Sequence, residues 1–315
     1  MATGPLLPTH EQIMVDKWSR SVAGHASEPQ LDRMDARPLA LLDQTLRPHL
    51  PSTYPPVADA AGSPMPPAAH LVYFPSPTQE PHLAPDGYHA DEAPPPPFAQ
   101  RVWAGGQIEF APHNPLRVDS VSSQTRTIVD VTTKDTAQQQ HLVFVKLKLQ
   151  ISNHSGLCLT ECRDLAYMKP TDLRRAPVKH NKSPDFTHAL IPSEILLFRY
   201  SALSWNSHRI HYDAPYACSV ERHPALLVHG PLTCTLLLQL LHANMPQHFA
   251  LKSFDYRAIA PAYCQQRMTL NGRWIQSQKP TDSSTIQCEL WASNNEDGIA
   301  MKGVATLVPT PSSLL

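Results

Sequence analysis

The segment Leu232–Leu241 limits what this chain can fold into more than any other stretch, because it is apolar almost all the way round a helix. Its residues are nearly all Leu, Thr and Cys, and a helix without a polar face is buried rather than half-exposed. His229-Gly230-Pro231 precedes it, and proline costs least in a first helical turn. The sequence therefore predicts a buried helix, with Gly230 at a start where backbone N–H groups can point into a pocket.

Stretches typical of β-strands lie on both sides of this helix. The expected strands are residues 122–132, 141–151, 157–167, 251–259, 266–274, 285–292 and 299–308. Alternating apolar and polar residues, together with turns such as residues 153–156 and 294–298, favour antiparallel pairing. A buried helix beside four long strands predicts an α+β fold.

Length and composition divide the chain into five expected parts. A chain of 315 residues has room for about two domains. Residues 51–98 hold 14 of the 33 prolines, which predicts a surface linker or lid rather than sheet, although residues 70–74 form an apolar island expected to dock on the core. Residues 169–188 are polar and basic, which predicts an exposed linker. The parts are a poorly defined segment 1–50 with a helix at 39–46, the Pro-rich linker or lid 51–98, an N-terminal half 99–168, the basic linker 169–188 and a C-terminal half 189–315.

Charge, cysteine spacing and hydropathy argue against several classes of protein. The formal net charge is −1 and charged residues make up 17%, so there is no basic field for nucleic acid. The six cysteines form no CxxC pair, which favours reduced thiols over zinc ligands or disulfides. No apolar run reaches the roughly 18 residues that a membrane span needs.

The chemistry is expected just before the buried helix, in the segment that contains Asn206, His208, Arg209 and His211. His208 and His211 are three residues apart and share one face of a helix, so His208 can orient His211. Simple packing, or a bond from His208 to Asp213, is the alternative. The spacing His208-x-x-His211-x-Asp213 also resembles a metal site, but helix capping explains Asp213 better, and no metal is expected.

Four stretches together resemble the MaoC-like (R)-specific hydratase and dehydratase family. They are RVWAGGQIEF at 101–110, TECRDLAYM at 160–168, FRYSALSWNSHRIHYDAPYA at 198–217 and HPALLVHGPLTCTLLLQLL at 223–241. They look most like the branch of fungal mitochondrial type 2 3-hydroxyacyl-thioester dehydratases and mesaconyl-C4-CoA hydratases. The resemblance runs from about residue 90 to the end. It implies a double hot-dog fold, with two curved antiparallel sheets, the second wrapped around the long buried helix and the first half catalytically silent.

The family motif Asp-x-Asn-Pro-x-His falls on residues 206–211, with two departures. His211 retains the histidine, but Asn206 stands at the acidic position and His208 at the asparagine position. An amide cannot act as a base at neutral pH, yet this pattern looks like the fungal and mesaconyl-type form of the motif. The resemblance therefore implies a working site in which His211 carries the proton, Asn206 holds the water, and His208 orients His211 or replaces the missing carboxylate.

The resemblance implies a hydro-lyase that interconverts 3-hydroxyacyl and trans-2-enoyl thioesters, as in mitochondrial fatty acid synthesis, without a cofactor. The N–H of Gly230 is then the expected oxyanion donor, and Trp205, Arg209 and His229 are candidate substrate-binding residues. Arg209 suits a structural salt bridge equally well, and His229 suits support of the turn. Two alternatives remain, a mesaconyl-CoA-type hydratase whose dicarboxylic substrate meets Arg209, and a non-catalytic hot-dog protein that binds acyl thioesters.

Partners and location follow from the same resemblance. The expected substrate is a thioester of coenzyme A or of acyl carrier protein, and a homodimer is compatible with the family. The resemblance implies a mitochondrial location. The N-terminal residues show no secretory signal, and Glu11 and Asp16 are untypical of a mitochondrial presequence, so the sequence itself favours the cytoplasm.

Overall fold

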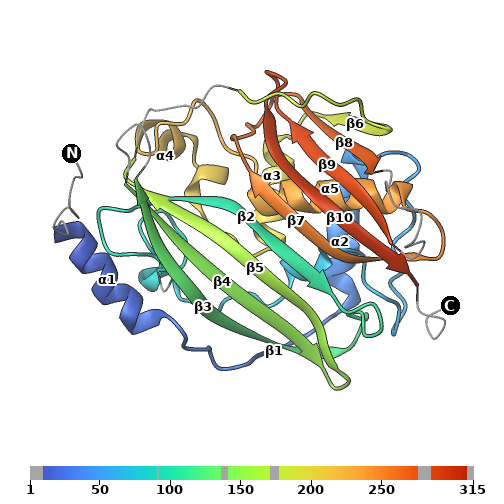
Figure 1. Cartoon of the computed structure of the whole chain (residues 1–315), viewed down its shortest axis with the longest axis horizontal. Helices are drawn as coiled ribbons and strands as arrows, with labels where there is room; N and C mark the ends of the chain where they lie inside the picture. Colours follow the sequence, from blue (N-terminus) through green and yellow to red (C-terminus); the bar gives the residue numbers. More distant parts are fainter. Residues whose placement is uncertain (1–9, 91, 136–140, 171–176, 276–284, 311–315) are drawn as a thin grey trace, which may run out of the picture.

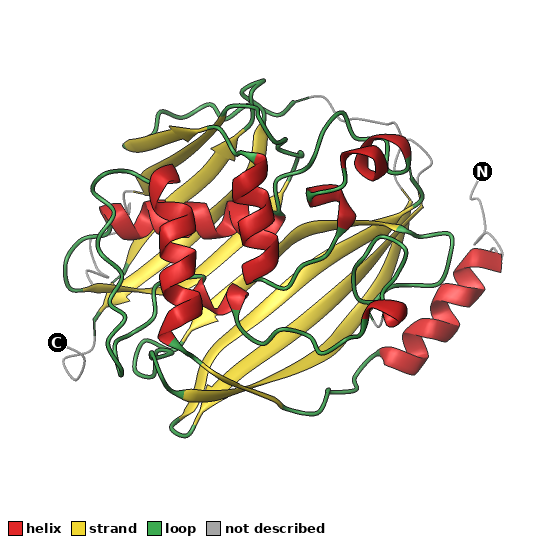
Figure 2. Ribbon diagram, turned by 180° about the vertical axis from the view of Figure 1, so that it is seen from behind, coloured by secondary structure: helices red, strands yellow, loops and turns green. Residues whose placement is uncertain are grey.

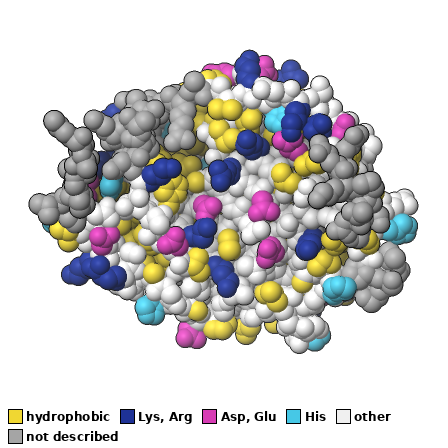
Figure 3. Space-filling view, in the orientation of Figure 1, with side chains coloured by type: hydrophobic (Ala, Val, Ile, Leu, Met, Phe, Trp, Pro, Cys, Tyr) yellow, Lys and Arg dark blue, Asp and Glu magenta, His cyan; other side chains and the backbone are white. Residues whose placement is uncertain are grey.

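One curved sheet dominates the computed structural model, which describes residues 10–90, 92–135, 141–170, 177–275 and 285–310. Within these ranges ten strands pair antiparallel in the order β1-β3-β4-β5-β2-β7-β10-β9-β8-β6. The helices α2, α3 and α5 lie together against one face of the sheet (Figure 1, Figure 2). The opposite face carries acidic and basic side chains side by side (Figure 3).

The strands and helices have the following bounds. The strands are β1 Gln30–Arg33, β2 Gln100–Phe110, β3 Val121–Asp135, β4 His141–Asn153, β5 Gly156–Met168, β6 Phe186–Leu190, β7 Phe249–Ala258, β8 Met268–Ile275, β9 Ile286–Ser293 and β10 Ile299–Pro309. The α-helices are α1 His10–Val22, α2 Ala36–Leu46, α3 Glu194–Leu203, α4 Ala214–Ser219 and α5 Gly230–Asn244, and the short 3-10 helices are η1 Arg47–His49, η2 Ala69–Val72, η3 Glu80–His82 and η4 Arg209–His211. All seven predicted strands and both predicted helices are confirmed, with ends that shift by a few residues. Among the described helices none is long and apolar enough to cross a membrane.

The two expected sheets are joined edge to edge where β2 pairs with β7, from Gly105 opposite Arg257 to Glu109 opposite Ser253. Two glycines allow this join. A Cβ at Gly105 would lie 2.6 Å from the carbonyl oxygen of Tyr256 on β7. A Cβ at Gly106 would lie 2.9 Å from the hydroxyl oxygen of the same tyrosine, and 2.2 Å from the carbonyl oxygen of Cys162 on the other neighbouring strand, β5. Because real Cβ atoms do not approach so closely, the join between the halves requires residues without side chains.

Helix α5 forms the core of the second half. Residues 232–241 are all buried, which confirms the helix predicted from its apolar composition. It packs against β8 and β9 in a cluster that includes Phe254, Leu270 and Leu290. Since apolar side chains surround it, packing rather than surface charge fixes its position.

The N-terminal region is more ordered than the sequence indicated. Residues 1–50 contain α1 and β1 as well as the expected helix. Helix α1 buries only Val15, and β1 is a four-residue edge strand paired with β3, so neither leaves a clear apolar period. In the Pro-rich stretch His70, Tyr73 and Phe74 are buried, which confirms that the apolar island docks on the core.

The expected basic linker 169–188 ends differently from the prediction. Strand β6 begins at Phe186 and pairs with β8 at the edge of the sheet, so residues 186–188 are strand rather than exposed linker. Residues 171–176, with their basic pair, lie outside the described residues. The sequence did not predict this strand because FTHAL is only five residues long and just one of them, Leu190, is buried.

The tight packing around α5 makes a prediction about stability. Leu237→Ala should lower the free energy of unfolding by about 3 kcal/mol, because it removes a side chain with no exposed surface and leaves a cavity. The control Leu31→Ala, at a leucine that is 71% exposed, should change it by less than about 0.5 kcal/mol. Urea unfolding of both variants measures the difference, and equal losses would contradict this account of the core.

Candidate active site

The predicted chemical residues lie in the connection between α3 and α5. Ser193 caps α3 by accepting the N–H of Leu196, and the chain leaves that helix through Trp205, whose φ of 52° is left-handed. Helix α4 then begins where Asp213 Oδ1 accepts the N–H of Tyr216 at 3.0 Å. The predicted capping by Asp213 is therefore confirmed. Between these two caps, η4 presents the motif residues to the start of α5.

Three buried histidines come together at this point. The ring of His211 stacks on that of His229 with 3.6 Å between centroids. His208 meets His211 edge to face at 5.5 Å. Because His229 directly precedes Gly230, the stacking places the His211 ring against the residue next to the start of α5. The structure thus brings together three of the predicted site residues.

His211 is held as a neutral base. Its Nδ1 lies 2.9 Å from the carbonyl oxygen of Leu227, and a carbonyl only accepts, so Nδ1 carries the hydrogen and Nε2 keeps its lone pair. Burial, reinforced by His229 and then His208, lowers the pKa of His211 well below its ordinary value. The residue lines a cleft of about 490 Å³ together with Phe198. A neutral acceptor at the edge of a cleft can exchange protons with a bound molecule.

His229 packs against the ring of His211 on the side of the protein core. Its Nε2 lies 2.8 Å from Oγ of Ser201, and its ring meets that of Tyr200. Burial, with a smaller contribution from His208, lowers the pKa of His229 to about 3. Since its side chain has no exposed surface, it packs under His211 rather than lining the cleft.

Gly230 provides the close contact between α5 and the sheet. It is the first residue of α5, and the first N–H groups of a helix have no carbonyl partner inside it. A Cβ at this position would lie 2.9 Å from Cβ of Trp103 on β2. Only glycine therefore lets the strand pack against the helix start without a shift.

The other predicted residues are engaged in different ways. Asn206 Oδ1 accepts the N–H of His208 at 3.0 Å, so its acceptor oxygen stabilises the turn. Nε and Nη2 of Arg209 donate to Oδ2 of Asp213 at 3.0 and 2.8 Å, and its guanidinium lies over the ring of Tyr216.

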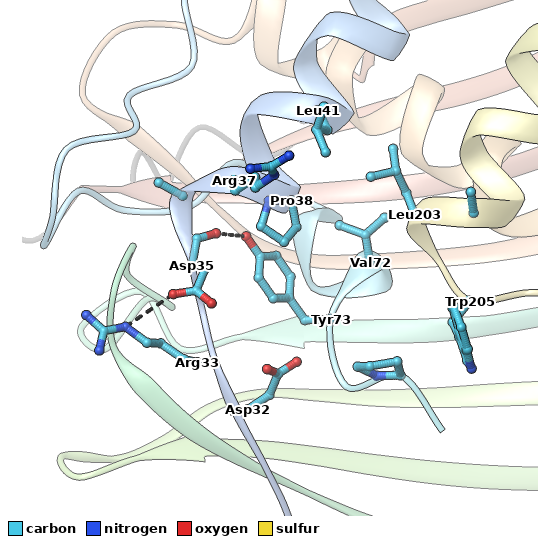
Figure 4. Close-up of a pocket in the computed structure, with 13 residues that line it drawn as sticks. Asp32, Arg33, Asp35, Arg37, Pro38, Leu41, Val72, Tyr73, Leu203 and Trp205 are labelled. Carbon is cyan, nitrogen blue, oxygen red and sulfur yellow. Dashed lines mark hydrogen bonds and ion pairs between the residues drawn. The ribbon is translucent and has the colours of Figure 1, made fainter. Parts of the chain in front are cut away.

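Trp205 lies apart from the histidine cluster. It is 61% exposed and lines a separate groove of about 680 Å³ with residues of α2 and of the Pro-rich stretch. Figure 4 shows its ring at the edge of that groove, on the same side as Leu203. A contact with the reacting part of a substrate would have to be made by other residues.

Two carboxylates that the sequence did not indicate flank His208. Its Nε2 lies 3.4 Å from Glu221 Oε1 and 3.5 Å from Asp86 Oδ2. Burial alone would raise the pKa of Glu221, but the neighbouring imidazoles of His208 and His223 outweigh it and lower that pKa to about 2. Neither carboxylate had a local signal, because Asp86 lies in the Pro-rich stretch and Glu221 in a loop. Among the described residues no group of three or more His, Cys, Asp or Glu side chains is arranged to hold a metal ion.

Comparisons with known proteins show which family and which relatives the sequence resembles. The family model for hydroxyacyl-thioester dehydratase type 2 matches residues 68–264. A mesaconyl-C(4)-CoA hydratase of Chloroflexus aurantiacus is 37% identical over 213 residues, which cover 65% of this chain and 74% of the relative. A mitochondrial hydroxyacyl-thioester dehydratase type 2 of Schizosaccharomyces pombe is 30% identical over 266 residues, which cover 76% of this chain and 87% of the relative.

Solved structures show the same fold at low sequence identity. A MaoC-like dehydratase from Phytophthora capsici has a TM-score of 0.60 and 14% identity, covering 93% of this chain and 99% of that one. A Mycobacterium tuberculosis protein described as a double hot-dog has a TM-score of 0.58 and 13% identity, with 92% and 97% covered. The predicted double hot-dog fold is confirmed.

The buried neutral histidines make stability depend on pH. The pKa of His229 is about 3 in the folded chain and about 6.5 in the unfolded one, so the unfolded chain binds the extra proton in between. The free energy of unfolding should therefore fall as the pH is lowered from about 7 to about 5. His229→Gln should make this slope shallower in urea unfolding.

His154→Gln is the matched control, since this histidine lies in an exposed turn. It should leave the slope unchanged. Glu161 and Glu221 have pKa values lowered to about 2, so their contribution is lost only below the usual carboxyl range of about 4.5. If His229→Gln and His154→Gln show the same dependence of the free energy of unfolding on pH between 7 and 5, His229 is not held in the neutral form in the folded chain.

Proposed function

The chain belongs to the hydroxyacyl-thioester dehydratase type 2 family, and on that premise we propose that it is a hydro-lyase that interconverts 3-hydroxyacyl and trans-2-enoyl thioesters. The observation that carries the proposal is His211, neutral and hydrogen-bonded through Nδ1, stacked beside the start of a buried helix. The thioester is of coenzyme A or acyl carrier protein. The name of the fission-yeast relative favours a mitochondrial location, and a homodimer stays a prediction.

His211 can carry the proton in both directions. In dehydration Nε2 takes the proton from C2 of the 3-hydroxyacyl thioester, and the electron pair moves into the thioester as an enolate. The C3–O bond then breaks, and the leaving oxygen takes the same proton back from the imidazolium to become water. The lowered pKa of His211 keeps Nε2 unprotonated at neutral pH, as the first step requires, and makes the imidazolium formed in that step a ready proton donor for the second. No other acid is needed to balance the protons.

Gly230 can stabilise the enolate oxygen. Its N–H lies at the positive end of α5, where an anion is favoured, and an oxyanion donor of this kind is typically worth about 3 kcal/mol. The absence of a Cβ also lets the thioester approach the backbone closely. The donor thus acts on charge that develops only during the reaction.

Arg209 bears on the choice of substrate. A mesaconyl-type dicarboxylic substrate needs a cation for its free carboxylate, and Arg209 was the sequence's candidate. Its guanidinium is already held by Asp213 and Tyr216, which favours a monocarboxylic 3-hydroxyacyl or enoyl group. The non-catalytic alternative is disfavoured because the relatives are named a hydratase and a dehydratase, and because a buried neutral histidine at a cleft suits proton transfer.

Hydration of crotonyl-CoA, followed by loss of enoyl absorbance, tests the activity. The wild-type protein should turn over, and His211→Ala should lower kcat by about 10²–10⁴-fold, because the proton carrier is lost. His154→Ala, in an exposed turn, should retain wild-type kcat. The wild-type rate should also persist well below the ordinary imidazole pKa of about 6.5. Tight binding of acyl-CoA without turnover would favour the binding protein instead.

Substitution at Gly230 tests the oxyanion donor. Gly230→Ala places a Cβ 2.9 Å from that of Trp103, so the helix start must shift and the N–H must move with it. We expect kcat to fall about 100-fold with a smaller change in KM. A companion variant, Trp103→Gly, removes the Cβ that the new methyl group would meet, and the double variant should recover part of kcat. No recovery, with both proteins folded by circular dichroism, would argue against the geometric cause.

Substitution at Arg209 separates the two enzymatic alternatives. Arg209→Gln should leave the ratio of kcat/KM for crotonyl-CoA over mesaconyl-C4-CoA unchanged, because the guanidinium is engaged by Asp213. Both rates are measured in the same hydration assay. A selective loss of the dicarboxylic substrate would instead assign Arg209 to substrate binding and favour the mesaconyl-type hydratase.

A further inference from the structure

The motif lacks a carboxylate where the hydratase family places one. Asn206 occupies the acidic position, and its Oδ1 already accepts the N–H of His208. The attacking water, or the leaving hydroxyl, therefore needs another group that accepts a hydrogen bond. His208 is the nearest imidazole to His211 apart from the fully buried His229.

Glu221 is a buried, charged carboxylate with few partners. Its side chain is 3% exposed, it is ionised because its pKa is about 2, and Oε1 lies 3.4 Å from Nε2 of His208. Oε2 lies 3.7 Å from Nε2 of His223, and within the described chain no donor completes a hydrogen bond to it. Gln100 fixes the backbone here by donating to the Glu221 carbonyl. A buried charge with so few partners is costly.

Asp86 touches the same nitrogen of His208 but is otherwise engaged. Its Oδ2 accepts from Nη2 of buried Arg101 at 3.1 Å, and its Oδ1 accepts the N–H of Tyr88 at 3.0 Å. Its charge is therefore balanced by a guanidinium. Glu221 faces only imidazoles and the Tyr216 phenol, whose pKa burial and the Glu221 charge raise, so the interaction with His208 matters more for Glu221.

We propose that Glu221 is a positioning residue for His208 and that the pair replaces the carboxylate missing at position 206. Both carboxylates face Nε2, which favours the hydrogen on Nε2, and in the neutral ring that leaves Nδ1 of His208 with its lone pair. This inference rests on the proposed hydro-lyase activity. It gives His208 a defined role that the sequence left open between orientation, packing and a bond to Asp213.

The proton balance of the proposed function is unchanged. In hydration one proton of the water passes to Nε2 of His211 while the oxygen bonds to C3, and His211 delivers that proton to C2. The second O–H stays intact, hydrogen-bonded to Nδ1 of His208, and becomes the 3-hydroxyl of the product. Glu221 takes no proton itself; it fixes which nitrogen of His208 is the acceptor.

The tautomer of His208 tests the contact in the wild-type protein. Ring nitrogen and carbon chemical shifts of histidine-labelled protein, assigned by comparison with His208→Asn, should show hydrogen on Nε2. Hydrogen on Nδ1, whether alone or on both ring nitrogens, would overturn the proposal. This measurement needs no active substrate and no folded Glu221 variant, so it decides the contact even where Glu221→Gln does not fold.

Kinetics of Glu221→Gln test the role. Because the amide can donate to Nε2, the His208 hydrogen should move to Nδ1, and kcat for crotonyl-CoA should fall about 10–100-fold with little change in KM. His154→Gln is the control, since this histidine lies in an exposed turn, and its kcat should stay within about twofold of wild type. A folded Glu221→Gln protein with wild-type kcat would overturn the proposal.

Different results would refute the hydratase activity and the role of Glu221. A wild-type protein that hydrates no enoyl thioester refutes the proposed function, whatever the tautomer. A wild-type protein that hydrates crotonyl-CoA, with Glu221→Gln equally active, refutes only the role of Glu221. Loss of kcat together with the change of tautomer supports the role, because a purely structural residue would alter stability without moving the hydrogen of His208.

Discussion

The contact between the start of α5 and strand β2 is the constraint on which the rest of the structure depends. Gly230 lies against Trp103 at a distance that leaves no room for a Cβ, and Trp103 Nε1 donates to the hydroxyl of Tyr256 on β7. The same region holds the two halves of the sheet together through Gly105 and Gly106. The contacts around Trp103 thus join both halves of the sheet and fix the start of α5. They leave no room for a Cβ at Gly230.

Charge at the site is arranged by burial rather than by the motif itself. Burial lowers the pKa of both stacked histidines; His229 and His208 add to the shift at His211, and His208 adds to the shift at His229. The negative charges lie one contact further out, on Glu221 and Asp86, where they meet His208 rather than His211. His211 therefore stays uncharged, while the ionised carboxylate of Glu221 contacts His208, which in turn contacts His211.

The sequence predicted those parts whose signals are local. Helix α5 was predicted from a run that is apolar almost all round the helix. The cap was predicted because Asp213 lies just before a helix start that contains a proline. Helix α1 was missed because it buries a single residue. The contacts of His208 could not be read from sequence, since Glu221 is 13 residues away in a loop and Asp86 comes from a stretch whose prolines indicated only a linker. Long-range contacts between irregular segments leave no period to detect.

The Pro-rich stretch is part of the site rather than a passive connection. The N–H of Arg209 donates to the carbonyl of Asp86, and Oγ of Ser207 donates to that of Gly87. A Cβ at Gly87, whose φ is 82°, would lie 2.3 Å from the carbonyl oxygen of Ser207, so the two loops are in direct backbone contact. Proline removes N–H groups that would need partners and limits the freedom of the unfolded chain. A segment poor in sheet-forming residues can therefore hold the motif loop in place, and it brings Asp86 to His208 because its backbone is fixed against that loop.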